Sequence, residues 1–468
     1  MADRAVKEVA IPVCIMVSAA SRLRSLMAAL ARRTPMPYRE IKPIERPRFT
    51  ADCKATHTIL APQMAPIHFE LIKTAIRKYG YNIVIPPMPN KQTTDVGLRY
   101  VNNDMCYPAI VVIGQLISAL KEGLCDPDHT SIVLFQTCGA CRATNYIGVL
   151  REALKYAGFP QVPVFACMGL PDETDDFKLS REMLVDVIKA SLYGDALMNV
   201  RNRMMPYELT AGSTQALYKK WLERAKAEIE HGSWWKYRRT MKALVRDFDH
   251  LPIDEELWKP KVGVVGEILV KYHPVANNHI EQVLMDEGAE VVMPDFVDFF
   301  LYSAYDPIAK RRLLSGSYKE QIFGKIFIRL LEFFRQPMRK ALKESKHFTA
   351  PRSIYETAKL AARHVSLGNM AGEGWFLTGE MVKLIDEGVP NVICLQPFGC
   401  LPNHITGKGV LHELRGSYEG ANLTAIDCDA GSSEVNQLNR IKLMLSVAKE
   451  RGPKQEKQRK SLLASGRP

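Results

Sequence analysis

The sequence predicts an α/β protein with parallel sheets and a helical insert. Short apolar runs rich in β-branched residues alternate with amphipathic stretches over residues 56–177 and again over residues 259–449. Strands that alternate with helices of about 10–15 residues are typical of βαβ units, and such units form parallel sheets. The intervening residues 178–258 contain consecutive helical patterns and no strand pattern. We therefore expect two Rossmann-like regions separated by a helical segment.

The first α/β region begins after a proline- and arginine-rich stretch, residues 1–55, which we interpret as a leader and linker. Runs of Val, Ile, Phe and Tyr predict its strands at 58–61, 81–85, 131–135 and 162–167. Apolar residues at helical spacing predict its helices at 66–79, 108–120 and 143–156. The same spacing predicts the helices of the helical segment at 181–205, 214–229 and 235–248.

The second α/β region shows the same alternation. Its strands are expected at 261–265, 290–293, 391–395 and 423–427. Its helices are expected at 274–287, 319–344, 353–365, 375–387, around 404–415 and at 434–449. The final stretch, 450–468, is basic and rich in Gln and Ser, a composition that suits a disordered tail.

The net charge of +12 over 468 residues lies mostly at the two ends of the chain. Residues 1–50 carry ten basic and four acidic side chains, residues 449–468 carry seven and two, and residues 51–448 are left at +1. A nearly neutral body does not favour a nucleic-acid groove, so we expect no nucleic-acid partner. The longest apolar runs are 12 residues, whereas a membrane helix needs about 20, so we expect no membrane association.

Four of the ten cysteines lie in loops that come before predicted helices. These are Cys106, Cys138, Cys141 and Cys400, and Gly139 and Gly399 stand beside three of them. We expect these loops at the carboxyl ends of parallel strands, where α/β sheets bind ligands. A helix N-terminus also stabilises a thiolate, so we expect lowered thiol pKa values. The other cysteines fall in predicted strands or in loops without polar neighbours.

Spacing alone leaves three interpretations of these thiols open. An iron–sulfur cluster held from separate loops accounts for Cys106, Cys141 and Cys400 together. A redox dithiol accounts only for Cys138 and Cys141. Buried thiols without a role are the third interpretation. Without a convincing secretory signal, we expect a reducing, cytoplasmic compartment.

Three further positions are candidates for the same site. His404 follows Cys400 by four residues, close enough to reach a cluster or to donate a proton, although a solvent-facing histidine fits equally well. Gly374, in Gly372-Glu373-Gly374-Trp375, either lines a ligand cleft or serves loop geometry at a helix start. The polar stretch from Lys271 to His273 is a candidate contact for an anionic substrate.

Five stretches closely resemble the 2-hydroxyacyl-CoA dehydratase/activase-related family, in the same order along the chain. They are residues 97–108, 139–146, 263–267, 395–404 and 433–440. The resemblance covers about residues 56–448. This part of the chain is similar to the C-terminal, cluster-binding portion of large activase-like proteins. It implies a [4Fe–4S] or double-cubane cluster on Cys106, Cys141 and Cys400, with one iron open. Where this chain has Cys138 the family usually has glycine, so Cys138 is an alternate ligand or an incidental thiol.

The resemblance also implies a function. Family dehydratases receive one electron from a separate ATP-hydrolysing activator and eliminate water from a 2-hydroxyacyl-CoA through a ketyl radical, and other branches reduce small substrates. This chain has no Gly-x4-Gly-Lys-Ser/Thr motif, so we expect an ATPase activator or reductase as partner, an acyl-CoA or other small molecule as substrate, and a homo- or hetero-oligomer. The alternatives are a non-catalytic electron-transfer or scaffold subunit, and a dithiol oxidoreductase that uses Cys138 and Cys141.

Overall fold

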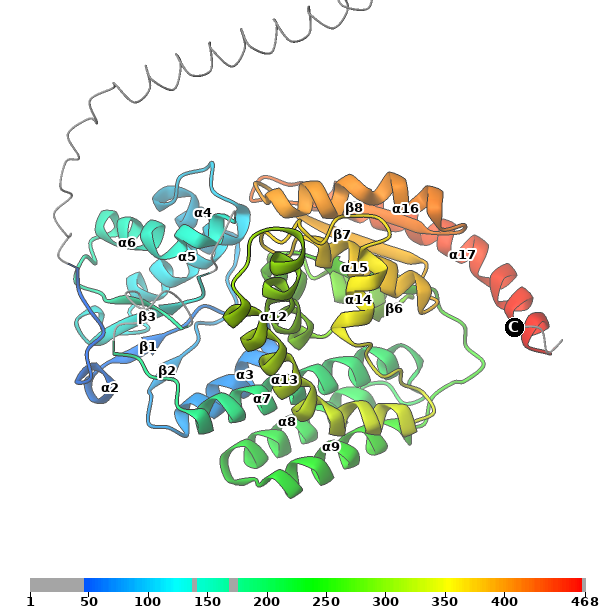
Figure 1. Cartoon of the computed structure of the whole chain (residues 1–468), viewed down its shortest axis with the longest axis horizontal. Coiled ribbons are helices and arrows are strands. Elements are labelled where there is room, and N and C mark those ends of the chain that lie inside the picture. The colour runs from blue at the N-terminus through cyan, green and yellow to red at the C-terminus, as the bar shows by residue number, and fades with distance from the viewer. Residues whose placement is uncertain (1–45, 137–140, 168–175, 465–468) are drawn as a thin grey trace, which may run out of the picture. The chain divides into compact units, whose positions relative to one another are not determined.

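Two four-stranded, all-parallel sheets form the centre of the protein, as a computed structural model shows (Figure 1). The structure describes residues 46–136, 141–167 and 176–464. The α/β class expected from the sequence is confirmed. The predictions for the leader up to residue 45, and those for Cys138 and Gly139, lie outside the described residues.

The first sheet has the strand order β2-β1-β3-β4. Its strands are β1 (Thr58–Leu60), β2 (Ile83–Val84), β3 (Thr130–Leu134) and β4 (Val164–Ala166). They lie where the apolar runs predict them; β1, β2 and β4 are shorter than predicted, and β3 has the predicted length but begins one residue earlier. A short helix, α2 (Cys53–Thr56), precedes β1. The helices that pack on the sheet include α3 (Pro66–Arg77), α5 (Tyr107–Lys121) and α6 (Tyr146–Ala157). The helix α5 is buried along almost its whole length, which explains its continuous apolar sequence.

A helix that the sequence did not predict, α4 (Lys91–Tyr100), precedes α5. Its residues are mostly polar, and a capping box between Asn90 and Thr93 starts it. Two glycines allow the two helices to touch: a Cβ on Gly97 would overlap the carbonyl oxygen of Ile110, and one on Gly114 would overlap that of Thr93. The expected strand-to-helix turn before α5 is therefore wrong, since α5 follows a helix.

The helical segment contains α7 (Arg181–Met204), α8 (Ser213–His231) and α9 (Trp234–Asp249), close to the predicted bounds. These helices share one apolar core with α12 (Phe296–Leu313) and α13 (Tyr318–Glu344). The sequence did not predict α12, because its apolar side chains surround the helix instead of forming a stripe and Pro307 lies inside it.

The second sheet has the order β6-β5-β7-β8. Its strands are β5 (Lys261–Gly266), β6 (Glu290–Val292), β7 (Asn391–Pro397) and β8 (Asn422–Cys428). Its helices are α10 (Ile268–Tyr272), α11 (Ile280–Asp286), α14 (Ile354–Ala361), α15 (Trp375–Asp386), α16 (Leu411–Ser417) and α17 (Glu434–Ala464). The expected helix at 274–287 begins only at Ile280, because the residues before it form a turn in which Asn278 and His279 have positive φ.

The backbone of α17 continues through the stretch expected to be a disordered tail, as far as Ala464. The residues beyond 449 are mainly Lys, Glu, Gln and Arg, which have good helix propensity. These residues provide no apolar face to pack against the protein, but a helix that has already formed can continue through them, because extending a helix is easier than starting one.

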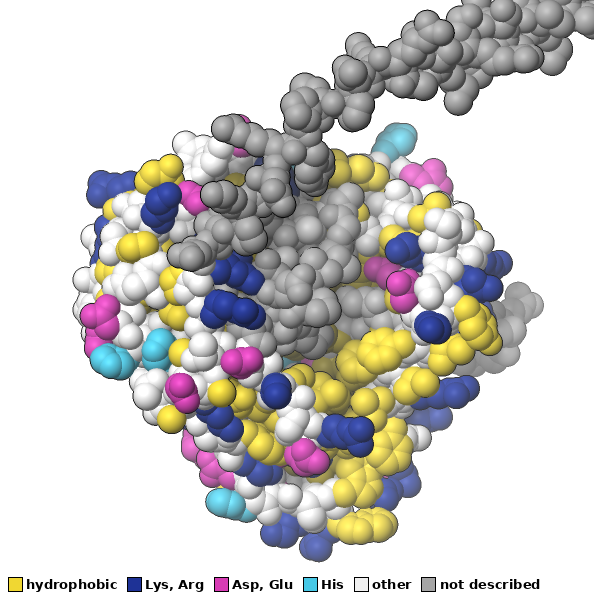
Figure 2. Space-filling model, turned by 60° about the vertical axis from the view of Figure 1, so that its left-hand side comes forward, with side chains coloured by type: hydrophobic (Ala, Val, Ile, Leu, Met, Phe, Trp, Pro, Cys, Tyr) yellow, Lys and Arg dark blue, Asp and Glu magenta, His cyan; other side chains and the backbone are white. Residues whose placement is uncertain are grey.

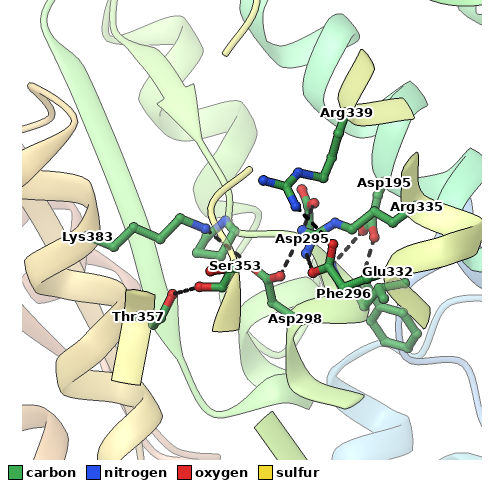
Figure 3. Close-up of polar contacts among 12 residues, drawn as sticks. Asp195, Asp295, Phe296, Asp298, Glu332, Arg335, Arg339, Ser353, Thr357 and Lys383 are labelled. Carbon is green, nitrogen blue, oxygen red and sulfur yellow. Dashed lines mark hydrogen bonds and ion pairs between the residues drawn. The ribbon is translucent and has the colours of Figure 1, made fainter. Parts of the chain in front are cut away.

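A buried ionic network links three helices of the second α/β region (Figure 3). Arg335 of α13 is fully buried and pairs with Asp295, just before α12, and with Asp298 of α12 at 2.7 Å. Lys383 of α15 reaches Asp298 at 3.2 Å. Because a buried charge is tolerated only when it is paired, these contacts fix α12, α13 and α15 relative to one another.

The α12–α13 hairpin has an exposed apolar surface with a basic margin. Its exposed apolar side chains are those of Leu313, Leu314, Tyr318, Ile322, Phe323, Ile326 and Phe333. Figure 2 shows a band of hydrophobic side chains on one face of the molecule, with Lys and Arg side chains along it. Residues 310–329 carry six basic and one acidic side chain, so the body of the chain is neutral in total but not locally. None of the described helices has the length and apolar character needed to cross a membrane.

Candidate functional site

The three cysteines of the candidate site lie at three helix starts. Cys106 is the N-cap of α5, and Cys141 is the N-cap of a short 3-10 helix, Arg142–Asn145, that leads into α6. Cys400 follows β7 and comes just before a π-helical turn, Asn403–Gly407. Cys141 and Cys400 thus lie beyond the carboxyl ends of β3 and β7, as expected, whereas Cys106 lies between two helices.

The loops that carry Cys106 and Cys400 are in direct contact. The backbone N–H of Tyr107 donates a hydrogen bond to the Phe398 carbonyl oxygen at 3.0 Å. Gly399 has a φ of +70°, and a Cβ on it would lie 3.1 Å from the Cα of Cys106. Glycine is therefore required here both for its backbone conformation and for the close approach of the two loops.

The loop before α15 brings Cys141 to the same place. Gly372 has a φ of +58°, and a Cβ on it would lie 3.5 Å from the Cys141 Sγ and 2.8 Å from the Pro402 Cγ. Pro402 is two residues beyond Cys400, so this loop contacts both the Cys141 and the Cys400 segments. Gly374 serves loop geometry: its φ is +44°, and a Cβ on it would overlap the carbonyl oxygen of Asn369.

Two carboxyls lie beside the thiols, that of Glu373 buried and that of Glu267 partly buried. Glu267 follows β5 and accepts a hydrogen bond from the Val270 N–H at 3.0 Å, and Glu373 accepts one from the Ile268 N–H at 3.0 Å. Burial, together with the neighbouring Glu373, raises the pKa of Glu267 to about 8. Burial also raises the pKa of Glu373. The pair is therefore at least partly protonated near neutral pH.

Burial and these carboxyls raise the pKa of all three thiols. The pKa of Cys141 rises to about 11 through burial and the charges of Glu373 and Glu267. Burial raises the pKa of Cys400 much further, with contributions from the same two carboxyls, and burial together with Glu267 raises that of Cys106. The expected lowering of these pKa values is wrong, because desolvation of the thiolate outweighs the helix N-terminus. The loop contacts described above bring the three thiols to a common region, and the charge of Glu267 contributes to the raised pKa of each.

Two polar side chains hold thiols in place. The Oη of Tyr146 lies 2.8 Å from the Cys106 Sγ, and the Nδ2 of Asn403 donates to the Cys400 Sγ at 3.4 Å. We did not predict roles for Glu267, Glu373, Tyr146 or Asn403 from the sequence. Each lies in or next to a stretch noted above, and Tyr146 and Asn403 follow a cysteine by five and three residues. Hydrophobic periodicity does not reveal such residues, because a single polar side chain forms no repeating pattern.

The other predicted site residues lie elsewhere. The side chain of His404 is exposed, and the backbone N–H of His404 donates to the Cys400 carbonyl oxygen at 3.2 Å. The prediction of an anion-contacting turn from Lys271 to His273 is wrong, because all three side chains are buried. Lys271 pairs with Glu380 at 2.8 Å, and burial lowers the pKa of His273 to about 4.

The site offers three thiols from separate loops, the donor type that holds iron–sulfur clusters. Across residues 46–136, 141–167 and 176–464, no three His, Cys, Asp or Glu side chains approach closely enough to hold one metal ion. A cluster of several irons and sulfides separates its thiolates more widely and is held by cysteines from distant segments. Gly372 and Gly399, which have positive φ, place no Cβ between the loops that carry the thiols. Gln396, near the end of β7, has a buried side-chain amide without a hydrogen-bond partner among the described residues.

Together, these features describe a parallel α/β protein with a thiol and carboxyl site formed by loops of both α/β regions. No protein-family model matches the chain, and it matches no curated protein. The resemblance of its motifs to the 2-hydroxyacyl-CoA dehydratase/activase-related family stays a prediction.

Proposed function

We propose that this protein binds an iron–sulfur cluster through Cys106, Cys141 and Cys400 and carries out low-potential, one-electron chemistry at it. The observation that carries the proposal is the contact among the three cysteine loops, which are far apart in the sequence. The Tyr107 N–H donates to the Phe398 carbonyl oxygen at 3.0 Å, and a Cβ on Gly372 would lie close to both the Cys141 Sγ and Pro402. Neutral buried thiols are poorly solvated, and binding to iron relieves this by replacing the proton with a cation. The motif resemblance supports the same conclusion.

The residues of this chain would divide the work as follows. Cys106, Cys141 and Cys400 would hold the cluster, and Tyr146 and Asn403 would orient two of the sulfurs by hydrogen bonds. When bound, the cluster supplies one-electron reduction and an iron with a free coordination position. Glu267 and Glu373 would share a proton beside the cluster and so limit the negative charge there. Burial of the loops would exclude water from the site.

The reaction class that we propose is a dehydratase or reductase step on an acyl-CoA or other small molecule. Because the chain lacks a phosphate-binding Walker motif, the low-potential electron would come from a separate ATP-hydrolysing activator or reductase. We also propose that the protein is an oligomer and lies in the cytoplasm, and the free state of all eight described cysteines is consistent with a reducing compartment.

A dithiol oxidoreductase is the less favoured alternative. An attacking cysteine needs a lowered pKa to be a thiolate at neutral pH, whereas burial raises the pKa of Cys141 to about 11. A non-catalytic electron-transfer subunit would bind the same cluster, and it would differ by showing no turnover when supplied with an activator.

Anaerobic purification with iron and sulfide analysis tests the proposal. We expect a brown protein with stoichiometric iron and sulfide, and an electron paramagnetic resonance signal after reduction. The variants Cys106→Ala, Cys141→Ala and Cys400→Ala should each lose most of the iron, whereas Cys125→Ala, a buried cysteine near the end of α5, should retain it. A colourless wild-type protein after cluster reconstitution would rule the proposal out. Iron retained in all three site variants would rule out the ligand assignment.

The variant Cys138→Gly separates the cluster from the dithiol. Iron content should stay unchanged if Cys106, Cys141 and Cys400 are the ligands. Loss of the iron would make Cys138 a ligand, and retention of iron with loss of all redox activity would favour the dithiol.

A further inference from the structure

Gln396 is a buried amide in the middle of the second sheet. It lies near the carboxyl end of β7, between β5 and β8, and is 1% exposed. Neither its Nε2 nor its Oε1 has a hydrogen-bond partner in the described part of the chain. Buried side-chain amides in folded proteins are nearly always paired, because an unpaired one loses its hydration without compensation. An unpartnered amide at this place therefore points to a bound group.

The direction of the Gln396 side chain follows from the alternation along β7. The Cys394 Sγ lies 3.8 Å from the Oδ1 of Asn403, and the Nδ2 of the same Asn403 donates to the Cys400 Sγ. Cys394 and the Cys400 thiol thus lie on one side of the sheet. Gln396 is two residues beyond Cys394, so its side chain faces that side too and lies nearer the carboxyl edge.

The sheet register brings a second site residue next to Gln396. Leu395 of β7 pairs with Gly266 of β5. Glu267 directly follows Gly266, so the chain leaves β5 for Glu267 next to the part of β7 that carries Gln396. Gln396 thus lies near the end of β7, four residues before Cys400, and its backbone is close to the point where β5 ends before Glu267.

We propose that Gln396 is a cluster-contacting residue whose Nε2–H group donates a hydrogen bond to a sulfur of the bound iron–sulfur cluster. The inference rests on the proposed function, since it needs a cluster at the three cysteines. A hydrogen bond to a cluster sulfur stabilises the extra negative charge of the reduced state and raises the reduction potential. Gln396 would therefore set the potential of the cluster without being a ligand to iron.

The chain offers a matched control in Gln115 of α5. Gln115 is 2% exposed, but its amide is fully used: Nε2 donates to the Pro87 carbonyl oxygen at 3.0 Å, and Oε1 accepts from the Gln63 N–H at 2.9 Å. Leucine at position 115 would leave these two backbone groups unpaired. Leucine at position 396 would leave no group of the described residues unpaired in the cluster-free protein.

The experiment compares Gln396→Leu, Gln396→Met and Gln115→Leu by two measurements. The first is the thermal midpoint of the cluster-free protein: Gln115→Leu should lower it, and both Gln396 variants should leave it unchanged or raise it. The second is the midpoint potential of the reconstituted cluster. The Gln396 variants should disfavour reduction at least tenfold, about 59 mV for one electron, while Gln115→Leu should not change it.

Each result decides one question. A wild-type protein without iron overturns the proposed function and the inference with it. If the wild type holds iron and both Gln396 variants keep its potential, the inference alone is overturned. A thermal midpoint lowered as much in both Gln396 variants as in Gln115→Leu would show that the Gln396 amide is paired within the chain, and this too overturns the inference. If Gln396→Leu fails to fold, Gln396→Met provides the same two measurements, because the flexible methionine side chain fits irregular spaces.

Discussion

The backbone N–H of Tyr107 donates a hydrogen bond to the carbonyl oxygen of Phe398 at 3.0 Å, and this bond joins the loop of Cys106 to the loop of Cys400. The first loop belongs to the first α/β region and the second to the other. The contact therefore depends on how the two sheets are placed. A site that draws its thiols from both regions exists only in the folded chain.

Gly399→Ala should weaken this junction. Alanine at a φ of +70° is strained, and its Cβ would lie 3.1 Å from the Cα of Cys106. We expect a loss of about 1–3 kcal/mol in the free energy of unfolding, measured by urea denaturation. Gly388→Ala is the matched control, because Gly388 has a φ of +82° and a Cβ on it would have no neighbouring atom within 4 Å. An equal loss in both variants would show that only backbone strain matters, not the approach of the two loops.

The stability of the protein should depend on pH through Asp306 of α12. Burial raises the pKa of Asp306 to about 8, whereas an unfolded aspartate titrates near pH 4. Between these values the folded state holds a proton that the unfolded state has released, so the free energy of unfolding falls as the pH rises. Asp306 should contribute up to about 1.4 kcal/mol per pH unit in this window.

Asp306→Asn should remove this contribution. The asparagine Oδ1 can still accept the hydrogen bond from the Trp375 Nε1, which lies 3.2 Å from Asp306. Denaturation curves at pH 5 and pH 8 should show a smaller decrease for the variant, which should be the more stable protein at pH 8. An identical decrease in both proteins would mean that Asp306 titrates normally.

Arg335→Met should strongly destabilise the protein. The change leaves Asp295 and Asp298 without the guanidinium that neutralises them in the interior. Removal of one partner of a buried ion pair costs about 3–5 kcal/mol, and chemical denaturation would measure it. Lys242→Met, which breaks an exposed pair with Glu344 at 3.0 Å, should cause no measurable change. A similar small effect for Arg335→Met would show that the buried carboxyls become protonated at little cost.

The local sequence was sufficient to predict most helices and all eight strands of the described chain. For example, β5 contains Val-Gly-Val-Val and β7 contains Val-Ile-Cys-Leu, because central strands of a parallel sheet are buried on both faces. The helices α2, α4, α10 and α12 were not predicted, and the two longer ones, α4 and α12, were missed for different reasons. In α4 the residues are too polar for an apolar stripe, and its partner α5 stabilises it through close glycine contacts. In α12 the apolar residues lie on all sides of the helix, so no helical periodicity appears.

The sequence by itself determined the α/β class and singled out Cys106, Cys141 and Cys400 as candidates, because strand and helix periodicities and cysteine positions are local properties of the chain. Only the tertiary structure decided what surrounds these thiols. It placed Glu267 and Glu373 beside them and left the Gln396 amide without a partner among the described residues. It also reversed the expected direction of the thiol pKa values. The physical reason is that desolvation and charge interactions depend on distance in space, and residues far apart in the sequence determine both.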